Sequence, residues 1–249
     1  PWCAHTFASV VHKDLDELMR KTKVKPTGKD LEGKMEGACG GDPADPTKPQ
    51  IKGRPAEHAA CILMKCLYGA RMARFDLLHA LTSLACQLTR WAPECDRKLH
   101  RLICHIHTSK HLRMIGYAGN SLKEVQPHLF ADADFAGCTA TQRSTSGLHL
   151  CIRGSKTCFP IEGQSKRQDC VSHSTPEAEI VAADFGLRLS GLPALDLWHV
   201  LLPIIPPLFF HADNQAMIHV INTGRNPRTH RVSVSRLHEV FKGADIVLM

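Results

Sequence analysis

The stretch FADADFAG, Phe130 to Gly137, places two carboxylates inside an otherwise apolar run. Aspartate is uncommon in strands, and an unpaired carboxylate is costly to bury. Because side chains alternate between the two faces of a strand, Asp132 and Asp134 leave the same face, close to where Gly137 ends the run. The pattern is typical either of a solvated strand end or of the beginning of a metal site.

The second half of the chain has the pattern of an α/β domain. The segments PHLFADADF, TSGLHLCIRG and, more weakly, KTCFPIEG predict three strands. A long helix is predicted over STPEAEIVAADFGLRLSGL, with Ser174 or Thr175 as N-cap, Pro176 near its first position and Gly191 beyond its end. The order is completed by the strand PLFFHAD, the helix NQAMIHVINTG, a shorter helix near Val234–Lys242 and the strand ADIVLM.

Composition and periodicity divide the whole chain into four segments. The first contains an amphipathic helix over residues 7–22, the second is rich in Gly, Pro and charge, and the third has three stretches with helical spacing. Because Pro1 is not a natural initiator, we expect a fragment of a longer protein. The segments are an N-terminal helical region 1–24, a linker 25–55, a basic helical subdomain 56–126 and the α/β domain 127–249.

Charge is distributed unevenly between the halves. Residues 1–126 carry 20 Lys and Arg against 13 Asp and Glu, whereas residues 127–249 carry 11 of each. The net charge of +7 therefore lies in the first half. There it indicates either an anionic partner or an ordinary solvated surface.

Hydropathy and cysteine usage indicate the compartment. The most apolar window, Leu192–Phe210, is a poor membrane span because it contains Asp196, His199 and four prolines, so we expect no membrane partner. We interpret it as a helix end, a loop and a buried strand. The 11 cysteines form no CxxC pair, which favours reduced thiols in an intracellular protein, cytoplasmic or nuclear.

Three acidic residues fall at equivalent places in the α/β domain. Asp132 lies in the first strand, Glu179 in the first turns of the long helix and Asp213 at the end of the fourth strand. Glu179 lies one turn before Ala183 and two before Leu187, so it faces the sheet. Converging carboxylates repel one another, and a pair of divalent cations such as Mg²⁺ removes the conflict.

Each acid also has a simpler explanation when it is taken alone. Asp213 suits the N-cap of the helix that begins at NQAMI, and Glu177 and Glu179 suit the positive end of a helix. Asp134 is either a neighbour of the metal site or a solvated bystander. Only the combination of three acids favours the metal site.

Four motifs strengthen that combination: IGYAGN…LFADADFAG, QRSTSGLHL, SKRQDCVSHSTPEAEIVAA and HADNQAMIHVI. Together they resemble the ribonuclease H region of copia-type retrotransposon Pol polyproteins, where SDADWAG-like, RSTSG-like, SKKQ…SSTEAEY-like and CDNQ-like segments occur in this order. The helical part before them looks like the connection or thumb-like stretch that follows the polymerase palm, with ARFDL in place of a TRPDI-like turn. The likeness covers residues of about 60 to 249.

The resemblance implies a ribonuclease H-like mixed five-stranded sheet with flanking helices, in which Asp132, Glu179 and Asp213 are the catalytic acids and bind Mg²⁺ or Mn²⁺. The implied activity is two-metal hydrolysis of the RNA strand of RNA–DNA hybrids during reverse transcription, with the rest of the Pol polyprotein as a partner. The palm's YxDD motif is absent from the sequence, so the chain is not a polymerase on its own. The residues expected to contact nucleic acid are Arg143, Ser144, Thr145, Asn214 and Gln215.

Departures from the family pattern support two other hypotheses. The chain stops at Met249, before the LAD-like motif that supplies a fourth acid, and NPRTH is shorter than the corresponding loop. Pro176 is an additional residue in the SSTEAEY-like motif, and Ser233 stands where relatives often have Asp. One alternative is a catalytically inactive nucleic-acid-binding relic, and another is a fragment that does not fold stably because a sheet edge is exposed. Asn214 and Gln215 are equally suited to the first turn of a helix.

Overall fold

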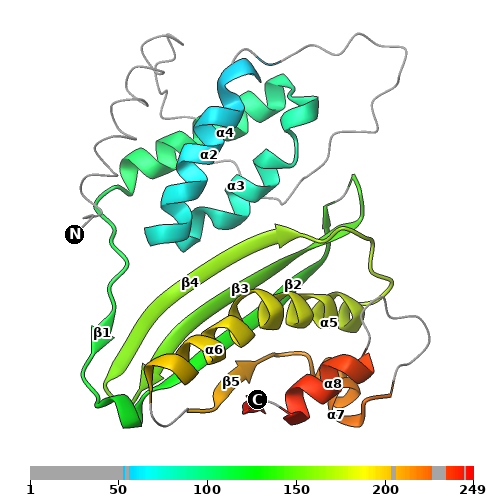
Figure 1. Cartoon of the computed structure of the whole chain (residues 1–249). Coiled ribbons are helices and arrows are strands. Elements are labelled where there is room, and N and C mark those ends of the chain that lie inside the picture. Colours follow the sequence, from blue (N-terminus) through cyan, green and yellow to red (C-terminus); the bar gives the residue numbers. More distant parts are fainter. Residues whose placement is uncertain (1–52, 54–55, 139, 203–205, 226–233, 244) are drawn as a thin grey trace. The chain divides into compact units, whose positions relative to one another are not determined.

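The computed structural model describes residues 53, 56–138, 140–202, 206–225, 234–243 and 245–249 (Figure 1). The described residues belong to two compact units, and the division falls between Arg113 and Met114. The helix predicted over residues 7–22, almost all of the linker 25–55, the NPRTH loop and Ser233 lie outside the described residues. The predictions made for those segments stay predictions.

The first unit is helical, as the three stretches of helical spacing predict. Leu63, Leu81 and Leu99, one from each helix, are buried in a common apolar core. Pro93 lies in the first turn of the third helix, where its missing N–H leaves no intrahelical bond unmade. The helices are α2 (Ala56–Ala73), α3 (Leu78–Ala85) and α4 (Pro93–Thr108).

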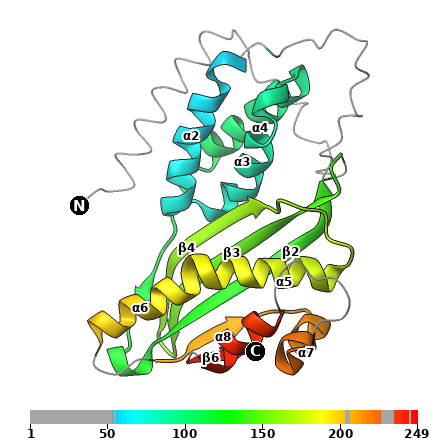
Figure 2. The same cartoon turned by 45° about the vertical axis from the view of Figure 1, so that its right-hand side comes forward.

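The second unit is built on a mixed six-stranded sheet, whose strands lie in the order β1-β4-β3-β2-β5-β6 (Figure 2). Neighbours from β1 to β2 in this order are antiparallel, whereas β2–β5 and β5–β6 are parallel. The strands are β1 (Tyr117–Ala118), β2 (Gln126–Cys138), β3 (Arg143–Gly154), β4 (Thr157–Arg167), β5 (Leu208–His211) and β6 (Ile246–Leu248).

The sheet has one strand more than the five predicted. The additional strand is β1, whose Tyr117 and Ala118 pair with Cys158 and Thr157 of β4. Two residues are too few to show an alternating pattern, which is why the sequence did not predict this strand. β1 lies inside the segment 56–126 assigned to the helical subdomain, but it pairs with the sheet of the second unit.

The long helix predicted after β4 does not end at Gly191. Gly191 has helical dihedrals (φ −66°, ψ −57°), and the helix continues. A Cβ atom at this position would lie 3.0 Å from Leu129 and 3.1 Å from Leu208, so glycine serves close helix–sheet packing here and not helix termination. The helical segments are α5 (Thr175–Gly186), the π-helical turn η5 (Leu187–Gly191), α6 (Leu192–Leu201), α7 (Gln215–Thr223) and α8 (Val234–Gly243).

The apolar window Leu192–Phe210 supplies α6 and the strand β5. Leu208 and Phe210 are fully buried, so the interpretation of a helix followed by a buried strand is confirmed. In the described part of the chain, no helix is both long and apolar enough to cross a membrane.

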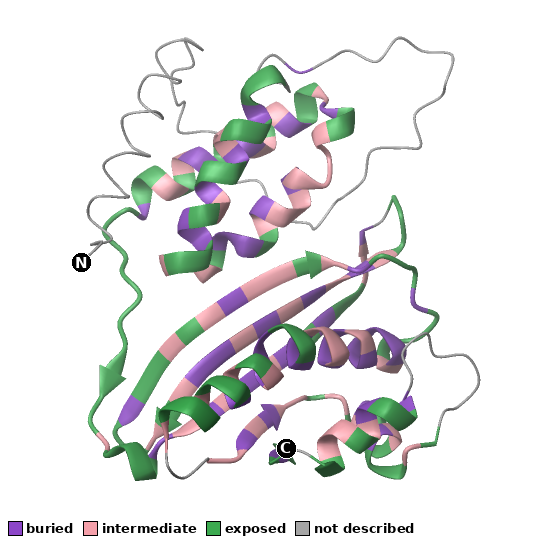
Figure 3. Ribbon diagram, viewed as in Figure 1, coloured by how far each residue is buried: buried purple, intermediate pink, exposed green. Residues whose placement is uncertain are grey.

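The two faces of the sheet differ. Along β2 buried and half-buried residues alternate (Figure 3). Leu129 and Ala131 belong to the apolar core under α5, whereas His128, Phe130 and Asp132 alternate with them and point to the opposite face. We call this opposite face, with its residues His128, Phe130 and Asp132, the acid face.

We expect Gly191→Val to lower the free energy of unfolding by about 1–3 kcal/mol, because the added methyl groups would enter space that Leu129 and Leu208 fill. Thermal unfolding followed by circular dichroism measures the change. Gly243→Val is the matched control, since a Cβ atom there meets nothing within 4 Å. Equal melting temperatures for the two variants would contradict the packing role of Gly191.

Candidate metal centre

Three carboxylates from separate parts of the second unit meet at one place. Asp132 comes from β2, Glu179 from α5 and Asp213 from the link between β5 and α7, and one oxygen of each lies within 4.8 Å of the others. Among the described residues, no other group of three His, Cys, Asp or Glu side chains has metal-binding spacing. The structure therefore brings together the three acids that the sequence analysis singled out.

The three carboxylates meet beyond the end of β5, which is shorter than β2. β2 and β5 pair only as far as Phe130 and His211, so β2 continues past the end of its parallel neighbour through Asp132 and Ala133. There the backbone N–H of Ala133 donates a hydrogen bond to the carboxylate of Glu179. A side chain from the helix that covers one face thus reaches an acid of the other face.

The start of α5 is fixed by its N-terminal cap. The Ser174 hydroxyl accepts a hydrogen bond from the Glu177 N–H at 3.4 Å, and the Glu177 carboxylate accepts one from the His173 N–H at 2.7 Å. Reciprocal bonds of this kind resemble a capping box and satisfy N–H groups at the helix start. Glu177 therefore has a structural role, and of the two glutamates Glu179 alone joins the carboxylate cluster.

Small side chains let α5 approach the end of β2. Ala178 and Ala182 are fully buried against Ala133 of the strand. Because no larger side chain separates the helix from the strand, Glu179 comes within reach of Asp132. The Glu179 side chain is consequently buried, with 5% of its residue surface exposed.

Asp213 is not the N-cap of α7, in contrast to the explanation that suits it when it is taken alone. Asn214 is the N-cap, and its side-chain oxygen accepts a hydrogen bond from the Met217 N–H at 3.0 Å. Asp213 also does not close the fourth strand, because β5 ends two residues earlier at His211. Since Asn214 caps the helix, the Asp213 carboxylate is left to join the cluster. Gln215 is the exposed first residue of α7, which agrees with the alternative of first-turn positions.

The cluster is electrostatically unfavourable without a cation. Burial raises the pKa of Glu179 to about 7, with further contributions from the negative charges of Asp132 and Asp213. The hydrogen bond from Ala133 lowers this pKa but does not offset the increase. A donor set made only of carboxylate oxygens suits hard cations such as Mg²⁺ or Mn²⁺ better than metals that prefer nitrogen or sulfur. The residues present therefore fit the metal that the sequence predicts.

The residues expected to contact nucleic acid beside the first strand differ in exposure. Contrary to the prediction, Ser144 offers no surface to a ligand: it is fully buried, and its hydroxyl accepts a hydrogen bond from the Ala136 N–H at 3.1 Å. Arg143 and Thr145 are partly exposed, and their contact with nucleic acid stays a prediction. The Thr145 N–H donates a hydrogen bond to the Asp134 carboxylate, so Asp134 braces the strand pair outside the cluster.

The acid face also carries a row of rings that the sequence analysis did not identify. His128 Nδ1 and His211 Nε2 lie 2.8 Å apart, and Phe130 stacks on His211 with ring centroids 4.3 Å apart. The Arg153 guanidinium lies 5.3 Å from the centroid of the Phe130 ring. The spacing of His128, Phe130 and Asp132 by two residues was the available signal, because it places all three on one strand face.

No protein-family model and no curated protein matches this chain. Among solved structures, ribonuclease H1 from the halophilic archaeon Halobacterium salinarum is similar to part of the chain, with 12% sequence identity and a TM-score of 0.34. The similarity covers 50% of this chain and 85% of that chain.

We expect Mg²⁺ to raise the melting temperature more at about pH 8 than at about pH 5.5, because protons compete with the metal for Glu179 below its pKa of about 7. In the metal-free protein, the pKa of Glu179 in the folded state lies above the ordinary value of 4.5. The contribution of Glu179 to the free energy of unfolding is therefore lost as the pH rises through 7. Melting curves with and without Mg²⁺ at both pH values measure the effect. Because the two curves at one pH are compared with each other, the effect of histidine titration on stability cancels.

Glu179→Gln is the control for this pH dependence. It removes the repelled charge, so the metal-free variant should be more stable than the wild type at about pH 8, by on the order of 2 kcal/mol. The variant should also lose most of the Mg²⁺-dependent stabilisation. A Mg²⁺ effect that is the same in the variant and the wild type would rule out Glu179 as a ligand.

Proposed function

We infer that the second unit is a ribonuclease H-type nuclease that cleaves the RNA strand of RNA–DNA hybrids with two divalent metal ions. The observation that supports this proposal is the meeting of three carboxylates within 4.8 Å, beyond the end of β5 and on a sheet face with exposed side chains. Structural acid clusters normally contain cationic partners, whereas among the described residues no Lys, Arg or His side chain forms an ion pair with Asp132, Glu179 or Asp213. A cluster of this kind suits cations supplied from solution.

All three acids would be metal ligands. Asp132 and Asp213 are exposed and would present ligand oxygens toward the substrate, whereas the buried Glu179 would be held between them by the Ala133 N–H. When bound, a pair of Mg²⁺ ions activates water and stabilises the leaving oxygen of a phosphodiester. Asn214 fixes the link that carries Asp213, because it caps α7 and so sets where that helix begins.

The substrate class follows from the sequence motifs that surround these acids. FADADFAG, RSTSG, STPEAEIVAA and HADNQ contain or adjoin the three acids, in the order of the copia-type Pol polyproteins. We propose that this chain derives from such a polyprotein, acts with its remaining parts inside the cell, in cytoplasm or nucleus, and recognises a hybrid through its backbone and 2′-hydroxyl groups. Arg143, Thr145, Asn214 and Gln215, all at least partly exposed, are the residues that would contact that backbone.

We expect the whole chain to cleave a labelled RNA–DNA hybrid in Mg²⁺, and Asp132→Asn to reduce the rate by at least about 100-fold, because it removes a charged metal ligand. A gel assay measures the cleavage. Asp134→Asn is the matched control: the same charge is lost from the same strand face two residues away, and the asparagine oxygen can still accept the Thr145 N–H bond. The control should retain most of the activity.

Two outcomes would contradict the nuclease. Salt-sensitive binding of the hybrid without any cleavage would support the alternative of a binding-only relic, whose basic charge lies in residues 1–126. Equal losses in Asp132→Asn and Asp134→Asn would show that charge on this face matters without a specific role for the cluster.

A further inference from the structure

We propose that the acid face has a second nucleic-acid contact, an open pocket at the start of β2 that binds the phosphate backbone of the duplex through Lys156, at its far end, and Arg153, whose side chain reaches back toward the carboxylates. The identity of the ligand rests on the proposed function, but its binding does not require cleavage. Four observations carry this inference: the construction of the pocket, its position on the acid face, its charge and its distance from the acids.

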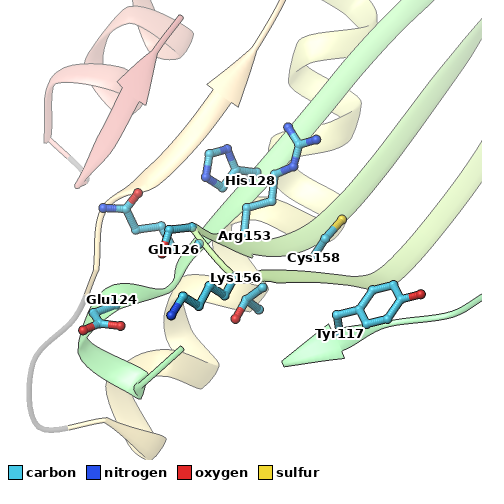
Figure 4. Close-up of a pocket in the computed structure, with 10 residues that line it drawn as sticks. Tyr117, Glu124, Gln126, His128, Arg153, Lys156 and Cys158 are labelled. Carbon is cyan, nitrogen blue, oxygen red and sulfur yellow. The ribbon is translucent and has the colours of Figure 1, made fainter. Parts of the chain in front are cut away.

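The pocket has a volume of about 700 Å³ and lies where β1, the start of β2 and the turn between β3 and β4 come together (Figure 4). Figure 4 shows Arg153, Lys156 and His128 on neighbouring segments of its wall, with Tyr117 on β1. The cations, the Gln126 amide and the Tyr117 hydroxyl offer hydrogen-bond donors, which is the chemistry that phosphate oxygens accept.

The pocket wall is held in place by the segment around Asn120, which belongs to the IGYAGN motif. The Asn120 side-chain oxygen accepts the Lys156 N–H at 2.6 Å, and its amide donates to the Ser155 hydroxyl at 2.9 Å. The Thr157 hydroxyl accepts the N–H groups of Gly119 and Asn120 at 3.1 and 3.0 Å. The backbone that carries Lys156 is therefore fixed in the folded protein.

Glycine is required for this bracing at two positions. A Cβ atom on Gly119 would lie 2.8 Å from the Lys156 carbonyl oxygen, and one on Gly154 would lie 2.8 Å from the Asn120 side-chain oxygen. Both contacts are shorter than real side chains tolerate. Gly119, Gly154 and Asn120 therefore hold the turn that carries the exposed Lys156.

Strand register places the pocket on the same face as the acids. Gln126, which lines the pocket, lies six residues before Asp132, so both side chains point to one face of β2. Gln126 is paired with Arg153 of β3, which therefore shares that face. The Arg153 side chain reaches back along the face and lies over Phe130, two residues from Asp132. A continuous surface connects the pocket with the carboxylates.

The charge of the pocket suits an anion. Arg153 and Lys156 are exposed, and within the described part of the chain neither forms an ion pair with a carboxylate. Glu124 is the acid among the lining residues, and its carboxylate accepts a hydrogen bond from the Asn120 amide at 3.0 Å. Burial lowers the pKa of His128 to about 4, so the positive charge at neutral pH comes from Arg153 and Lys156.

The distance from the acids predicts which duplexes can use the pocket. Six residues of extended strand separate Gln126 from Asp132 and span about 20 Å, so Lys156, in the turn beyond Arg153, lies roughly six base pairs of a duplex away from the acids. The Arg153 guanidinium lies closer to the acids, because its side chain reaches back over Phe130. A hybrid of about five base pairs cannot contact both the acids and Lys156, whereas one of about 14 base pairs can. Lys156 should therefore add affinity only to the longer duplex.

The test measures binding by fluorescence anisotropy over a range of salt concentrations, with the whole chain and with Ca²⁺ in place of Mg²⁺, so that a cation occupies the carboxylates while cleavage is not the readout. The probes are RNA–DNA hybrids of about five and about 14 base pairs. The variants are Lys156→Gln and the double variant Arg153→Gln/Lys156→Gln. The double control is Lys166→Gln/Arg188→Gln, which removes two exposed cations from the side of the sheet that α5 covers, where Lys166 lies over Phe185 and Arg188 pairs with Asp184.

We expect Lys156→Gln to bind the longer hybrid at least about threefold more weakly, and the slope of log K against log salt concentration to fall by about one unit; the double variant should lose about one to two units. Lys156→Gln should change binding of the short hybrid by less than about twofold, and the double control should change binding of both hybrids by less than about twofold. An equal loss of affinity for both hybrid lengths, or no loss of affinity for the longer one, would contradict the role of the pocket in binding. Because no cleavage is measured, an inactive chain with length-dependent losses would refute the nuclease and leave the pocket standing.

Discussion

Repulsion among three carboxylates held within 4.8 Å of one another is the constraint on which the second unit depends. Such a group opposes folding until a cation binds, so packing elsewhere must hold the acids together. That packing lies on the opposite face of the sheet, where Ala178 and Ala182 fit against Ala133 and Gly191 fits against Leu129. The apolar face of the sheet therefore stabilises the geometry of the polar one.

The acid face combines features that are separate in the sequence but adjacent in the sheet. Asp132, Phe130 and His128 follow one another at two-residue spacing along β2, and His211 joins them from β5. Arg153 connects this row with the turn between β3 and β4. One long strand thus organises a surface about 20 Å in length, which is the scale of a nucleic-acid duplex and not of a small molecule.

Much of the fold could be predicted because its main elements carry their own patterns. Buried residues alternate with more exposed ones over the first eight residues of both β2 and β3, and Ser174 with Pro176 marks the start of α5. β1 could not be predicted, because its two residues form a strand only by pairing with β4. Gly191 was misread because glycine both ends helices and permits close packing, and only the neighbouring Leu129 and Leu208 decide between these roles.

The site was predictable in its residues but not in its surroundings. The acids could be selected because Asp132 lies in the first predicted strand, Glu179 in the first turns of the helix that packs on the sheet and Asp213 just after the neighbouring strand. Asp213 and Asn214 are both good N-cap residues, so the sequence alone could not say which one caps α7 and which one is left for the cluster. The burial of Ser144 depends on an irregularity between β2 and β3, where Ala136 has a φ of 53°, and no local pattern signals it.

The most direct test of the metal centre is a crystal structure of the chain grown with Mn²⁺ and measured at a wavelength where manganese scatters anomalously. We expect two anomalous peaks roughly 4 Å apart, each within about 2.0–2.4 Å of carboxylate oxygens of Asp132, Glu179 or Asp213. Absence of both peaks at saturating Mn²⁺, or peaks bound by other residues while these three carboxylates lie apart, would contradict it.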